Sequence, residues 1–88
     1  MSLEELKNAL NGNTLSYGSV STSALMNIMK FVNVELLMDR KTLDYYYKIV
    51  VDDLLKSEMP IGELETLKKQ GWSFDNDDKS LILFLKNI

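Results

Sequence analysis

Residues 72–85 read WSFDNDDKSLILFL, and this stretch decides most of the fold. Five consecutive apolar residues at 81–85 follow a polar segment at 75–79 and a short aromatic segment at 72–74. Two apolar or aromatic runs separated by about five polar residues are typical of a β-hairpin. We therefore predict a hairpin with strands at 72–74 and 80–85.

The second strand of this hairpin is apolar on both faces. One face carries Leu81, Leu83 and Leu85, which we expect to face the helices. Ile82 and Phe84 then point the other way, beside Trp72 or Phe74, because side chains alternate along a strand. A strand with one face in water should instead alternate apolar and polar residues. Two interpretations stand side by side: a second copy or another protein covers Ile82, Phe84 and Trp72, or the N-terminal helix or segment of the same chain covers them.

Two helices have clear end signals. Ser2 followed by Glu5 is a capping box, and leucines at helical spacing after it predict a helix over residues 2–11. A second helix is predicted from Ile61 to Gln70, with acidic residues in its first turns and lysines in its last. Gly71 follows at the position that favours a left-handed cap.

The middle of the chain is less clearly patterned. Residues 21–38 are apolar on nearly every helical face and predict a central helix, although alternation at 32–36 leaves a strand over residues 31–37 open. Residues 39–56 carry apolar positions at helical spacing and predict a further helix. On it Tyr45 lies about one turn before Ile49, so these two residues form a second candidate contact patch. Residues 14–20 fit either a strand or a loop.

These elements predict one α+β domain spanning residues 1–88, because typical domains have about 100–150 residues. About four short helices pack on the C-terminal hairpin. If the segment near residues 14–17 is a strand and not a loop, it extends the hairpin into a small three-stranded sheet. The order of elements is similar to that of a winged-helix domain, an architectural similarity without a sequence motif.

Composition excludes much catalytic chemistry. The chain has no cysteine and no histidine, so disulfides, thiolate nucleophiles, zincin motifs and histidine general bases are ruled out. We expect no enzyme activity and no cofactor. The acidic cluster Asp75, Asp77 and Asp78 invites a calcium interpretation, but Lys79 and Ser80 stand where an EF-hand loop needs a ligand and glycine. A solvated turn is the preferred interpretation, and no metal is expected.

Charge argues against nucleic acid as a partner. Thirteen acidic residues outnumber ten basic ones, and Arg40 is the only arginine, the residue best suited to paired hydrogen bonds with guanine and phosphate. The longest apolar run has five residues, far short of the roughly 20 that span a membrane, and no signal peptide is evident. We expect a cytoplasmic protein. The lysine- and asparagine-rich composition also raises the hypothesis of a phage or mobile-element product.

The sequence thus predicts a small non-catalytic protein-interaction module. It would form homo-oligomers or regulate or inhibit a larger protein through the apolar hairpin face, with no small-molecule substrate. The alternative hypothesis is a winged-helix-type DNA-binding regulator. Glu63 and Glu65 argue against it, because they begin the helix that would approach the phosphates.

Overall fold

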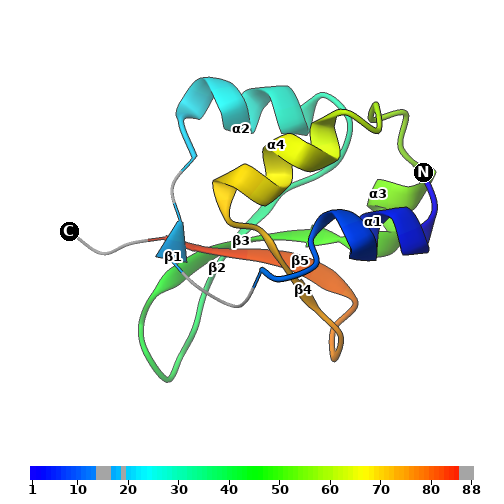
Figure 1. Ribbon diagram of the computed structural model, residues 1–88. Helices are drawn as coiled ribbons and strands as arrows, with labels where there is room; N and C mark the ends of the chain where they lie inside the picture. Colours follow the sequence, from blue (N-terminus) through cyan, green and yellow to red (C-terminus); the bar gives the residue numbers. More distant parts are fainter. Residues whose placement is uncertain (14–16, 19, 86–88) are drawn as a thin grey trace.

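The computed structural model describes residues 1–13, 17–18 and 20–85. Within this part of the chain it has the predicted α+β architecture, with helices on a sheet (Figure 1). The helices are α1 (Leu3–Ala9), α2 (Thr22–Met29), α3 (Val51–Lys56) and α4 (Glu63–Gln70). The strands are β1 (Tyr17–Gly18), β2 (Glu35–Met38), β3 (Tyr45–Val50), β4 (Ser73–Asp75) and β5 (Ser80–Leu85).

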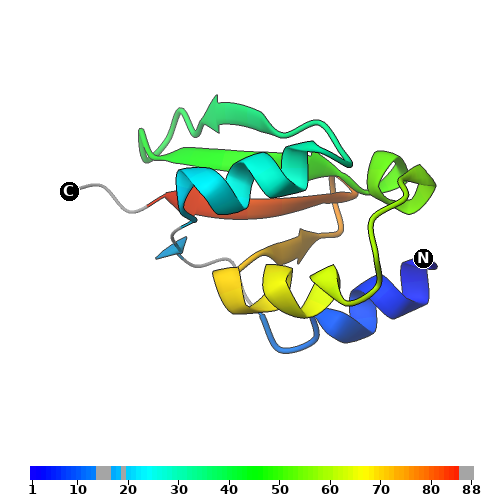
Figure 2. The ribbon, with the colours of Figure 1, turned by 90° about the horizontal axis from the view of Figure 1, so that it is seen from above.

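The sheet is larger than the three strands expected. Its order is β1-β5-β3-β2, and β4 also pairs with β5. The four longer strands are antiparallel, and the two-residue β1 runs parallel to β5. β4 and β1 share one side of β5, β3 occupies the other side, and β2 is the outermost strand beyond β3 (Figure 2).

The first and last elements of the described chain fold as their local signals predict. The Ser2 hydroxyl accepts a hydrogen bond from the Glu5 N–H at 3.1 Å, and the Glu5 carboxylate accepts one from the Ser2 N–H at 3.0 Å, completing the capping box of α1. Gly71 ends α4 in the left-handed conformation, with φ at 99°. The predicted C-terminal hairpin is β4 and β5. Of the segment expected to be a strand or a loop, positions 14–16 and 19 lie outside the described residues.

The two middle helices are shorter than predicted. The preferred helix over 21–38 is wrong beyond Met29, because residues 35–38 form β2, the strand alternative for this segment. The helix expected over 39–56 is confined to α3, since Tyr45–Val50 form β3. Aromatic and β-branched residues favour strands, and this segment is paired on both sides, with β2 and β5. The expected order of elements is kept, with the β2–β3 pair inserted between α2 and α3.

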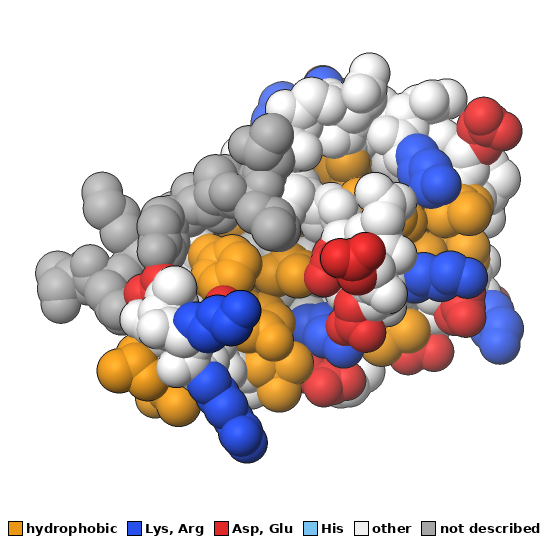
Figure 3. Space-filling view, turned by 90° about the horizontal axis from the view of Figure 1, so that it is seen from below, with side chains coloured by type: hydrophobic (Ala, Val, Ile, Leu, Met, Phe, Trp, Pro, Cys, Tyr) orange, Lys and Arg blue, Asp and Glu red, His pale blue; other side chains and the backbone are white. Residues whose placement is uncertain are grey.

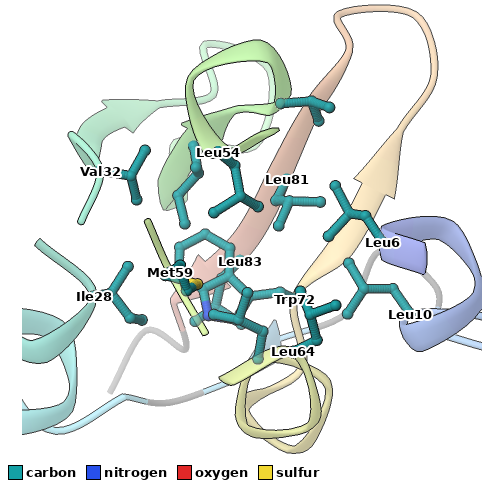
Figure 4. Packing of buried hydrophobic residues seen from close by; sticks show 13 residues of the cluster. Leu6, Leu10, Ile28, Val32, Leu54, Met59, Leu64, Trp72, Leu81 and Leu83 are labelled. Carbon is teal, nitrogen blue, oxygen red and sulfur yellow. The ribbon is translucent and has the colours of Figure 1, made fainter. Parts of the chain in front are cut away.

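The hydrophobic core lies between the helices and one face of the sheet. Figures 1 and 2 show α2 above β3 and β5 and not above β2, with α4 on the β4 side of the sheet and α1 next to α4. Trp72 is completely buried, among leucines from α1, α4 and β5 (Figure 4). Leu81 and Leu83 also have no exposed surface, which confirms that they face the helices. We refer to the opposite side of the sheet as the open face.

Candidate protein-interaction surface

The open face carries a row of apolar side chains across three strands. Leu37 on β2 pairs with Tyr46 on β3, and Tyr46 pairs with Phe84 on β5. The Tyr46 and Phe84 rings contact each other, with centroids 5.2 Å apart. All three side chains are half-buried. Figure 3 views this face and shows hydrophobic side chains bordered by basic and acidic ones. Part of the predicted apolar hairpin face is therefore accessible.

Ile82 contributes less to this face than expected. It points away from Leu81 and Leu83, as the alternation predicts, yet only 9% of its surface is exposed. Lys48 lies opposite Ile82 on β3, and Ser73 lies opposite it on β4. Because its neighbours already cover most of this side chain, Phe84 is the more accessible of the two predicted contact residues.

An ion pair borders the apolar row. The Lys48 ammonium binds the Asp78 carboxylate, which extends from the loop between β4 and β5. The hydrogen bond from Lys48 lowers the pKa of Asp78 below its usual value, and the attraction between the charges acts in the same direction. The same hydrogen bond raises the pKa of Lys48. This pair fastens the loop to the central strand β3.

Two of the predicted contact residues belong to the core. Trp72 and Ile49 have no exposed surface, so neither is available to a partner in this fold. Trp72 or Phe74 was expected beside Ile82 and Phe84, but Ser73 is the residue opposite Ile82, and Phe74 lies opposite Leu81 on the helix side. The indole N–H of Trp72 donates to the Gln70 side-chain oxygen at 2.9 Å. The Tyr45 and Ile49 patch expected on a helix is not formed, because both residues lie on β3 and Ile49 is buried in the core. Tyr45 alone remains accessible, with 49% of its surface exposed.

The largest concentration of exposed apolar residues lies elsewhere, between residues 26 and 45. Six of the eight large hydrophobic residues exposed in the described part of the chain fall there: Met26, Met29, Leu36, Met38, Leu43 and Tyr45. Two of them are on α2, and the other four are on the β2–β3 hairpin. Leu36 pairs with Tyr47 and Met38 with Tyr45, on the helix side of the sheet. They are exposed because α2 does not extend over β2 (Figure 2).

β2 is thus apolar on both faces as well as outermost. Leu36 and Met38 lie on the helix side, and Leu37 lies on the open face. No other described strand pairs with the outer edge of β2. Edge strands of this kind are normally protected by charged residues, proline or a bulge, because they pair readily with another chain. Within β2, Glu35 at the first position is the one charged residue.

The backbone of β2 offers hydrogen-bonding groups to this edge. The Asp39 N–H donates to the Asp44 oxygen at 2.8 Å, in line with the β2–β3 register. Hydrogen-bonded and non-hydrogen-bonded pairs alternate along antiparallel strands. The backbone groups of Leu37 therefore face β3, and those of Leu36 and Met38 face outward. We call this edge, with the side chains of Leu36, Leu37 and Met38, the β2 edge.

Sequence reasoning missed the β2 edge because it assigned these residues to a helix. The signal that pointed to it was the period-two alternation at 32–36, which continues into the strand. The exposure of Leu36 and Met38 depends on the position of α2, which is set by the tertiary packing and has no local sequence signal.

The acidic loop is held as a turn. The Asp75 carboxylate accepts a hydrogen bond from the Asp77 N–H at 3.1 Å, and Asp78 binds Lys48 and the Ser80 hydroxyl. Among the residues that the structure places, no group of three or more acidic side chains is arranged to hold a metal ion. None of the described helices combines the length and the apolar character needed to cross a bilayer.

Comparison of the chain with protein-family models, with curated proteins and with solved structures gave no match. The surface itself is therefore the basis for a functional proposal. Its main features are the apolar β2 edge, the exposed residues around it and the row of apolar side chains on the open face.

Proposed function

We propose that this protein is a non-catalytic protein-interaction module that binds through the β2 edge by accepting an extended strand from another polypeptide. The observation that carries the proposal is an outermost strand with apolar side chains on both faces and outward-facing backbone groups. Strand addition obtains affinity from main-chain hydrogen bonds and specificity from alternate side chains. The β2 edge offers both kinds of contact.

The neighbouring apolar residues support the same role. Leu37 belongs both to the β2 edge and to the row with Tyr46 and Phe84, so an added strand would extend the apolar open face. On the helix side, Leu36, Met38 and Tyr45 are each about half exposed. An added strand would cover apolar surface on both sides of the sheet, which contributes about 25 cal/mol for each Å² removed from water.

The alternative, a winged-helix-type DNA-binding regulator, has less support. The helix that precedes the hairpin, α4, carries Glu63 and Glu65 in its first turn, and three aspartates lie at the end of β4 and in the hairpin loop. Acidic groups at these positions repel phosphates. The absence of histidine and cysteine from the sequence, together with the apolar nature of the surface, favours binding over catalysis. A cytoplasmic location, expected because the chain lacks cysteine, completes the proposal.

The test is a nuclear magnetic resonance titration with a strand-forming peptide, Lys-Val-Thr-Val-Thr-Val-Lys, blocked at both ends. Its lysines complement Glu35 and Asp39, which flank the apolar part of the edge. We expect the largest amide shifts at Leu36 and Met38, whose N–H groups face outward, and smaller shifts at Leu37. The control peptide has proline in place of the central valine, which removes a donor, and it should bind more weakly. Shifts confined to other surfaces, or no shifts, would refute the proposal.

A further inference from the structure

We propose that the strand received by the β2 edge is β2 of a second copy, paired antiparallel about a two-fold axis that passes beside Leu36. This inference rests on the proposed function and adds the identity of the partner and the register of pairing. The β2 strand is short and apolar. A second copy of β2 supplies both contacts that an added strand needs, outward-facing backbone groups and alternate apolar side chains.

Symmetry restricts the registers that are available. Two identical antiparallel strands are related by a two-fold axis perpendicular to the sheet, so one residue must lie opposite its own copy. An axis beside Glu35 would place that carboxylate opposite itself. An axis beside Leu37 would place Glu35 opposite Asp39 of the second copy. Like charges directly opposite each other destabilise a strand pair, so both registers are disfavoured.

Two registers remain, and the fold distinguishes between them. An axis beside Met38 would require residues 40 and 41 to continue the ladder, but these residues form the turn between β2 and β3. An axis beside Leu36 needs only residues 34–38. It places Leu36 opposite itself, Val34 opposite Met38 of the second copy and Glu35 opposite Leu37 of the second copy. No two acidic residues lie directly opposite each other, and Glu35 and its copy are only diagonal neighbours.

The chosen register also fits the backbone and the side chains. The outward-facing N–H and C=O groups of Leu36 meet those of the second copy, so the central residues exchange two hydrogen bonds. On the helix side, the row of Val34, Leu36 and Met38 meets the same row in reverse order. Val34 is half-buried, and Leu36 and Met38 are exposed, so pairing removes apolar surface from water. No helix covers β2 to block the approach (Figure 2).

The expected association is moderate and depends on concentration. A pair of four-residue strands with its flanking side chains is smaller than a standard interface of about 800 Å² per partner. We expect the molar mass measured by light scattering to rise from the 10.1 kDa monomer toward twice that value as the protein concentration increases from about 10 μM to about 1 mM. A monomer throughout this range would overturn the inference.

Substitutions test the surface used. Lysine in place of Leu36 sets two like charges opposite each other at the axis, so Leu36→Lys should weaken association at least about tenfold. Leu43→Lys is the matched control, because Leu43 is 63% exposed but lies in the turn, outside the pairing register. Circular dichroism spectra should confirm that both variants are folded. Equal association by Leu36→Lys and the unmodified chain would overturn the inference.

Cysteine cross-linking tests the register. The chain has no native cysteine, so only the introduced thiols can form a disulfide. Under mild oxidation Leu36→Cys should form a covalent dimer, because directly opposite residues lie within disulfide range. Leu37→Cys should give no more covalent dimer than Leu43→Cys, because residue 37 and its copy would be diagonal neighbours about 7–8 Å apart. Preferential cross-linking of Leu37→Cys would overturn the proposed register.

The peptide titration separates the two proposals. If the chain stays monomeric but binds the valine and threonine peptide at Leu36 and Met38, the proposed function stands and the second copy is ruled out as the partner. If the chain stays monomeric and does not bind this peptide, both proposals are refuted.

Discussion

Gly18→Ala should destabilise the fold more than any other glycine-to-alanine substitution in the chain. Gly18 lies on β1, where an added Cβ would be 2.5 Å from Leu83 Cδ1 and 2.6 Å from the Gln70 backbone oxygen. The leucine tip can rotate away, but the carbonyl belongs to the last residue of α4 and moves only with the helix. The overlap between the added Cβ and this carbonyl can therefore be removed only if β1 and α4 move apart.

Overpacking of this kind typically costs about 1–3 kcal/mol. Because the contact involves backbone, we expect about 2–3 kcal/mol for Gly18→Ala. With a urea dependence of about 1–3 kcal/mol per molar for a small domain, the unfolding midpoint should fall by about 0.7–3 M. This is a large part of the total stability, since domains are usually stable by only about 5–15 kcal/mol.

The assay is urea unfolding followed by the fluorescence of Trp72, the only tryptophan, which is fully buried in the folded state. Gly62→Ala is the control, because an added Cβ there meets nothing within 4 Å and the backbone already has helical angles. Its midpoint should not decrease. Equal midpoints for Gly18→Ala and the unmodified chain would show that β1 does not pack against α4 and β5 as described.

Three further substitutions test the other parts of the fold. Asp78→Asn should lower the free energy of unfolding between about pH 4 and pH 10, where both members of the Lys48–Asp78 ion pair are charged. Because the pKa of Asp78 is lowered in the folded state, the stabilisation from the pair is lost as the pH falls through that pKa. Because the pKa of Lys48 is raised, the same stabilisation is lost as the pH rises through that pKa. Urea unfolding midpoints of the variant and the unmodified chain at pH 7 and pH 3 check this. The same difference in midpoint at both pH values would contradict it. Ser2→Ala should cost about 1 kcal/mol by removing the α1 cap, whereas Ser23→Ala, an exposed position within α2, should change the melting temperature little. Asn13→Ala should cost about 1–3 kcal/mol, because the Asn13 amide donates to the Lys68 oxygen at 3.1 Å and to the Trp72 oxygen at 2.8 Å; an unchanged urea midpoint would refute this role.

Local signals predicted the ends of the chain well. The capping box at Ser2 and the glycine at position 71 depend on interactions within a few residues, so a single sequence contains them. The apolar run of β5 likewise predicted a strand buried on its helix side, with Ile82 and Phe84 turned to the opposite face.

The middle of the chain and most of the candidate surface depended on contacts between distant residues. Tyr46, Tyr47 and Val50 fit a helical stripe as well as a strand. The structure pairs the two tyrosines with β2 and β5, and Val50 with β5. Once Tyr45–Val50 is a strand, Ile49 faces the core and β2 becomes the sheet edge. Trp72 was assigned to the surface because its burial beneath α1 and α4 cannot be inferred from its neighbours in the sequence.

Amide hydrogen exchange in β2 tests most directly whether this edge pairs with a second copy. In dilute solution the amide of Leu36 should exchange quickly, because it faces outward, and the amide of Leu37 should be protected by β3. As the protein concentration rises, exchange at Leu36 and Met38 should slow, and exchange at Leu43 in the turn should not change. Exchange at Leu36 that is independent of concentration, at concentrations where the molar mass rises, would contradict the account.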